Sequence, residues 1–126
     1  MGQSTEDLLR SFELQAAEHA ERARLLSRRL EQSSTVVESR GGEVRVAVDS
    51  TGGLSALQFG STARDVPLDR LADLVLTTSR QAQARLADSL GELAAQLYGP
   101  GSSTATFISQ TYAERFPAPD DDGDQR

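Results

Sequence analysis

Arginine is the residue type with which this sequence could do chemistry. All 13 basic residues are Arg, and Lys is absent. A guanidinium forms two parallel hydrogen bonds with a phosphate group, which suits Arg to contacts with a nucleic-acid backbone. The arginines cluster in two stretches, and these clusters predict a DNA-contacting surface composed of Arg22, Arg24, Arg28, Arg29, Arg80 and Arg85.

A second interpretation of the same arginines stays open. Several have an acidic residue three or four positions away, the spacing that places two side chains next to each other on a helix. These pairs are Glu18 with Arg22, Glu21 with Arg24, and Glu31 with Arg28. Such a stretch could be an ordinary solvated helix face. The formal net charge of −6 also weakens long-range attraction to nucleic acid.

Catalysis and metal binding have no comparable support. There is no Cys, and His19 is the one imidazole, at a position typical of a polar seam residue. The glycine pairs at 41–42 and 52–53 lie between expected strands, where turns explain them, rather than between a strand and a helix. The aspartates within 120–124 lack the spacing of a calcium loop. We therefore predict no enzyme activity, no cofactor and no metal site.

The first arginine cluster belongs to a long helix expected over residues 4–33. Ser4 is the predicted N-cap, and Glu6 and Asp7 are the acidic residues of the first turn. The three-four spacing of a coiled coil recurs at Leu9, Phe12, Ala16, His19, Ala23, Leu26, Leu30, Ser33 and Val37. About 30 helical residues extend about 45 Å, more than so short a chain can cover by itself. The residues with this spacing form a stripe along one side of the helix. This coiled-coil stripe favours a homodimer, with an intramolecular helix pair as the alternative.

Three short strands are predicted next. Residues 35–39 are rich in β-branched side chains, and residues 44–49 alternate strictly, with three valines on one face. Residues 54–59 form a less regular third strand. Glycine-containing turns join the strands into an antiparallel meander. Because so small a sheet is marginal in water, its apolar face must pack against another element.

A second long helix is predicted to start at Pro67, with Asp65 as its N-cap, and to end at Tyr98 before Gly99. We expect a domain over 1–99. The segment 100–126 is then a largely disordered Gly-, Pro- and Asp-rich tail with a short helix over 106–116. The sequence has neither a membrane-spanning apolar run nor an export signal, so we expect an intracellular protein without a membrane partner.

The glycine turns and the strand between them carry a family resemblance. Three segments resemble the YbaB/EbfC family, and the similarity extends over about residues 8–98. The segments are Val36-Val37-Glu38-Ser39-Arg40-Gly41-Gly42-Glu43-Val44-Arg45-Val46-Ala47-Val48-Asp49, Gly52-Gly53-Leu54-Ser55-Ala56-Leu57 and Leu68-Asp69-Arg70-Leu71-Ala72-Asp73-Leu74-Val75. The resemblance implies an α+β fold of order α-β-β-β-α and a homodimer with tweezer-like helical arms.

The same resemblance implies a function. It is that of a bacterial nucleoid-associated protein, located in the cytoplasm on the nucleoid, which binds duplex DNA without strong sequence preference. The helical arms, with the six arginines of the two clusters, would present the DNA-contacting surface. The alternative is a dimeric protein-interaction or secretion-associated scaffold that keeps the fold without binding DNA, and its partner would be another protein.

Overall fold

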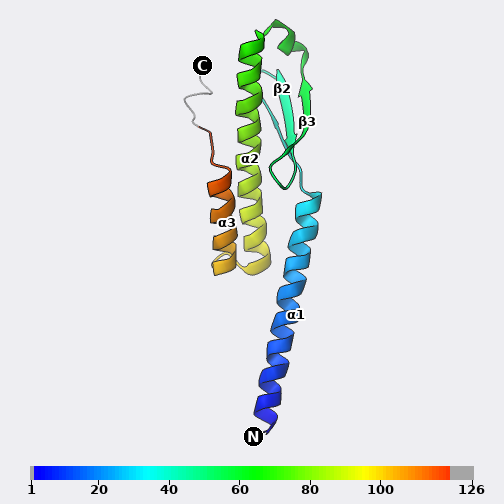
Figure 1. Cartoon of the computed structure of the whole chain (residues 1–126), viewed down its shortest axis with the longest axis vertical. Helices are drawn as coiled ribbons and strands as arrows, with labels where there is room; N and C mark the ends of the chain where they lie inside the picture. Colours follow the sequence, from blue (N-terminus) through cyan, green and yellow to red (C-terminus); the bar gives the residue numbers. More distant parts are fainter. Residues whose placement is uncertain (1, 120–126) are drawn as a thin grey trace.

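The computed structural model describes residues 2–119, and the aspartates at 120–124 lie outside the described residues. The elements are α1 (Gly2–Gln32), β1 (Thr35–Glu38), β2 (Val44–Val48), β3 (Leu54–Phe59), the 3₁₀ helix η1 (Ser61–Asp65), α2 (Leu68–Tyr98) and α3 (Ser103–Arg115). The long helix α2 is central, with α3 on one side and the sheet on the other (Figure 1). The predicted α+β order of helix, three strands and helix is confirmed.

The helix α1 is uninterrupted, because no Gly or Pro follows Gly2 within it. Its start differs from the prediction. Ser4 lies inside the helix rather than at the N-cap, and Glu6 and Asp7 lie beyond the first turn. The C-terminal half of α1 lies beside the rest of the molecule, whereas its N-terminal half projects past the end of α2 (Figure 1).

The sheet is an antiparallel meander in the order β1-β2-β3, as predicted. Val46 of β2 pairs with Val37 of β1 and with Leu57 of β3. The predicted alternation of β2 is confirmed, since Val44, Val46 and Val48 are buried. In contrast, every residue of the edge strand β3 is exposed.

The hydrophobic core forms between the sheet and one face of α2. Ala82, Leu86 and Leu90 follow one another at single-turn spacing on α2 and pack against the valines of β1 and β2. Leu30 of α1 and Phe116 after α3 add partly buried side chains at the margins of this core. The small sheet thereby gains the packed face that it needs for stability.

The β2–β3 turn is closed by the Asp49 carboxylate. Its Oδ1 accepts hydrogen bonds from the Thr51 hydroxyl at 2.6 Å, the Thr51 amide at 2.9 Å and the Gly53 amide at 3.2 Å. The Thr51 hydroxyl, and then the two amides, stabilise the ionised form and hold the pKa of Asp49 below its ordinary value. The turn is therefore organised by its own side chains.

Gly52 joins this turn to the helices. Its φ of 84° is in the left-handed region that glycine adopts readily. The Gln83 side-chain amide of α2 donates a hydrogen bond to the Gly52 carbonyl at 2.9 Å. The Phe116 ring lies so close to Gly52 that an added Cβ would overlap it. The turn is thus fixed between α2 and the end of α3.

The helix α2 starts one residue later than predicted. Pro67 is its N-cap, with an extended ψ of 144°, and Asp65 is instead the last residue of η1. The predicted end at Tyr98 is confirmed, and Gly99 follows with a φ of 97°. No helix within residues 2–119 combines the length and apolarity required to cross a membrane.

The helix α3 starts three residues before the predicted 106–116 segment. Ser102 caps it, because the Ser102 Oγ accepts a hydrogen bond from the Ala105 amide at 3.0 Å. α3 packs along α2 so closely that a Cβ added to Gly91 would press on the Ser109 side chain. The boundary between a domain at 1–99 and a tail stays a prediction, but a cut after residue 99 would remove a packed helix.

Candidate nucleic-acid interface

The first arginine cluster lies on α1 with all four side chains exposed. Glu21 forms an ion pair with Arg24 at 3.5 Å and another with Arg28 at 3.8 Å. All three side chains are more than half exposed, so these pairs contribute little to stability and can exchange for contacts with another anion. Arg22 and Arg29 form no ion pair with any residue in 2–119.

Only part of the expected charge pairing on α1 therefore forms. The Glu21–Arg24 pair is confirmed, whereas Glu18 with Arg22 and Glu31 with Arg28 are not ion pairs in the described chain. Arg28 reaches back two turns to Glu21 instead. The expected partner of Arg22 therefore does not form an ion pair with it, and the interpretation of α1 as a solvated face stays open.

The helix separates the four arginines into two ridges. At about 100° per residue, Arg22 and Arg29 lie within about 20° of each other around the axis, and Arg24 and Arg28 within about 40°. We call these the Arg22/Arg29 ridge and the Arg24/Arg28 ridge. The two ridges are about 130° apart, so one flat surface cannot contact all four side chains.

The two predicted arginines of α2 also belong to different surfaces. Arg80 and Arg85 are both exposed, but the five-residue step from one to the other rotates the helix by about 140°. Arg85 lines a groove with a volume of about 780 Å³, and Arg80 does not. The arrangement therefore does not combine them into one site.

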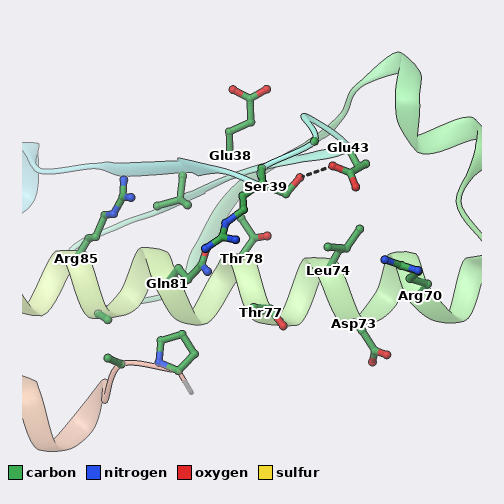
Figure 2. A pocket seen from close by; sticks show the side chains of 16 residues that line it. Glu38, Ser39, Glu43, Arg70, Asp73, Leu74, Thr77, Thr78, Gln81 and Arg85 are labelled. Carbon is green, nitrogen blue, oxygen red and sulfur yellow. Dashed lines mark hydrogen bonds between the residues drawn. The ribbon is translucent and has the colours of Figure 1, made fainter. Parts of the chain in front are cut away.

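We call this cavity the arginine groove. It is lined by α2, by β1 with the turn that follows it, and by Ala118 and Pro119 (Figure 2). Its basic lining residues are Arg40, Arg70 and Arg85. Its acidic lining residues are Glu38, Glu43 and Asp73, and its uncharged polar side chains include Ser39, Thr77, Thr78 and Gln81.

The charged side chains of the arginine groove point in different directions. Figure 2 shows Glu38 pointing away from α2, Asp73 pointing away from the strands, and Arg85 extending from α2 toward the strands. Glu43 is engaged by the Ser39 hydroxyl, which donates to its Oε1 at 3.1 Å. Two of the three carboxylates are therefore directed away from the space between the strands and α2, and the third is hydrogen-bonded.

The sequence pattern did not identify Arg40 and Arg70 as members of the arginine groove. Arg70 and Arg85 are 15 residues apart, which places them about 60° from each other around α2, so helical periodicity alone could have paired them. Arg40 carries no such signal, because its place depends on how the β1–β2 turn folds against α2.

His19 has a packing contact in this structure. Its ring meets Tyr98 edge-on, with centroids 5.8 Å apart and planes at 76°. The contact joins the middle of α1 to the last residue of α2. Within residues 2–119, no three His, Asp or Glu side chains are grouped as a metal site would require.

Apolar side chains remain exposed at two places. On the projecting half of α1, Leu9 is 61% exposed and Phe12 is 75% exposed, although both belong to the predicted coiled-coil stripe. On β3, Leu57 is 39% and Phe59 is 54% exposed. Exposed apolar side chains that lie close together are typical of surfaces through which proteins associate.

The comparison with curated proteins gives no match to this chain. The family model of the YbaB/EbfC DNA-binding family matches residues 7–101. This span contains most of α1, the whole sheet, all of α2 and the six candidate arginines. The match confirms the resemblance seen in the glycine turns and the β2 strand, and the chain belongs to the YbaB/EbfC DNA-binding family.

Proposed function

We propose that this protein binds duplex DNA without sequence preference, as a homodimeric nucleoid-associated protein of the cytoplasm. Membership of a DNA-binding family over residues 7–101 is the observation that carries the proposal. The exposed guanidinium groups of α1 supply the chemistry, because each can form two hydrogen bonds with a phosphate. Contacts of this kind fix a protein on the duplex and carry no sequence information.

The Arg22/Arg29 ridge is the main contact surface in this proposal. Its guanidinium groups have no ion pair in residues 2–119, so DNA need not displace a carboxylate from them. The Arg24/Arg28 ridge must first exchange Glu21 for phosphate. Because the chain carries a net charge of −6, attraction is local rather than long-range, and the affinity is weak.

Duplex binding by the full chain over a salt series tests the proposal. We expect Kd values near the non-specific range of about 10⁻⁴ to 10⁻⁶ M at physiological salt. The logarithm of the association constant should fall linearly with the logarithm of salt concentration, equally for AT-rich and GC-rich duplexes. Absence of binding at about 0.1 M salt, or a strong preference for one sequence, would contradict the proposal.

A dimeric protein-interaction scaffold is the second candidate. The net charge of −6 and the exposed apolar stripe of α1 favour it, since neither feature requires DNA. It predicts a dimer that shows no measurable duplex binding at about 0.1 M salt in the same titration. The two functions are therefore separated by one measurement.

Both candidates require a homodimer, for which the exposed apolar residues of α1 and β3 provide surfaces. We expect light scattering to give twice the 13.5 kDa of the single chain. Changing Leu57 and Phe59 together to Glu should shift the mass toward one chain, because two charges would enter an apolar contact. Gln58→Glu is the matched control on the opposite face of β3. A parent chain with a single-chain mass, or a Leu57/Phe59 variant that stays dimeric, would contradict this interface.

A further inference from the structure

We propose that the arginine groove binds the chain's own acidic C-terminal run, Asp120, Asp121, Asp122 and Asp124. The supporting observations are the place at which the described chain ends, the length of the groove, and the exposed arginines Arg40 and Arg85 in its lining. None of them depends on DNA binding.

The end of the described chain lies at the groove. α3 runs back along α2 from the far end of that helix (Figure 1). Phe116 anchors the segment after it, because its ring lies on Gly52 and stacks near Tyr112 with centroids 6.4 Å apart. Ala118 and Pro119 then line the arginine groove. The described residue next to the acidic run in the sequence, Pro119, is therefore part of the groove wall.

The acidic run can extend over most of the length of the groove. Five extended residues reach about 17 Å. Along α2, the lining residues extend from Arg70 to Arg85, over about 22 Å. An extended acidic run can therefore reach along most of this part of α2.

The lining of the groove carries three arginines and three carboxylates, so the binding rests on two exposed arginines rather than on its net charge. Arg40 and Arg85 are exposed and can offer paired hydrogen bonds to carboxylate oxygens. Asp73 and Glu43 are lining carboxylates that oppose such binding, although Glu43 is hydrogen-bonded to Ser39 and Glu38 points away from α2. The short covalent tether also gives the run a high effective concentration at the groove, so individually weak contacts are sufficient.

Paramagnetic relaxation in the full chain tests this binding. The sequence has no Cys, so Gln125→Cys introduces one site for a nitroxide label. Labelled chains diluted with unlabelled ones report contacts within one chain. We expect loss of the amide signals of Gly41 and Thr77, which line the groove, and intact signals for Thr5 on the projecting half of α1. Changing the four aspartates to Asn should restore the lost signals.

Substitutions in the groove give the matched comparison. Arg40→Gln with Arg85→Gln should restore the signals, Asp73→Asn should deepen the loss, and Arg45→Gln with Arg64→Gln should change nothing. These exposed positions tolerate the change, so folding is not at issue. Signals at Gly41 and Thr77 that persist in the parent chain, or a loss that survives the four Asn substitutions, would overturn the proposal. Because no DNA is present, this result is independent of the proposed function.

Discussion

Replacing Arg22, Arg24, Arg28 and Arg29 together by Gln should weaken duplex binding about 100-fold at about 0.1 M salt. Each phosphate contact releases counterions, so removing contacts lowers the affinity and also flattens its dependence on salt. The salt slope should fall by up to about one for each contact that is lost. Filter binding or fluorescence anisotropy over a salt series measures both quantities.

The two ridges of α1 sharpen this experiment. Arg22→Gln with Arg29→Gln should account for most of the loss, because these guanidinium groups have no ion pair in the described chain. Arg24→Gln with Arg28→Gln should cost less, since Glu21 already occupies both. Arg45→Gln with Arg64→Gln removes the same charge from the sheet and η1, and serves as the control. Equal losses in all three double variants would show that net charge, and not the α1 surface, determines binding.

Gly52→Ala should lower the free energy of unfolding by about 3 kcal/mol. A φ of 84° contributes about 1–2 kcal/mol for a residue with a Cβ. Overlap of the new methyl group with the Phe116 ring contributes about 1–3 kcal/mol more. Urea unfolding at a fixed chain concentration measures the change, because dimer formation would otherwise shift the midpoint.

Gly42→Ala is the matched control for this substitution. Gly42 has a similar φ of 73°, but a Cβ there would meet only the Glu38 side chain, at an ordinary distance of 3.4 Å. The loss should therefore be limited to the backbone contribution of about 1–2 kcal/mol. In a double-mutant cycle, Phe116→Ala should relieve part of the Gly52→Ala loss. Equal losses at Gly42 and Gly52, with no coupling to Phe116, would exclude the ring overlap.

The fold was predictable wherever the apolar pattern of the sequence agrees with the burial of the side chains. Strict alternation in β2 identified Val44, Val46 and Val48 as core residues, since only one sheet face is packed. Element ends were less predictable, because Ser4 is a good cap by residue type but lies inside α1 itself, and Asp65 is the last residue of η1. Ser102 was the missed cap, and its hydroxyl moves the start of α3 ahead of the predicted residue 106.

The candidate site was predictable residue by residue but not as an arrangement. The arginines expected to be exposed are exposed, yet helix periodicity distributes the α1 group over two ridges and separates Arg80 from Arg85. The arginine groove could not be predicted, because Arg40 comes from a turn whose position over α2 depends on tertiary packing. The role of the six candidate arginines in DNA binding stays a prediction.

The projecting half of α1 has a consequence for the cooperativity of assembly. The residues before His19 extend about 25 Å beyond its contact with Tyr98, and a free helix of that length is marginal in water. Its helical state is sustained by continuity with the packed half, which supplies the nucleus. A second chain that packs over Leu9 and Phe12 therefore stabilises a helix that is already nucleated. Its binding does not have to offset the free-energy cost of starting a new helix. In the proposed homodimer, association would therefore further stabilise the helix of the arm, and the helical content of its end would rise with chain concentration.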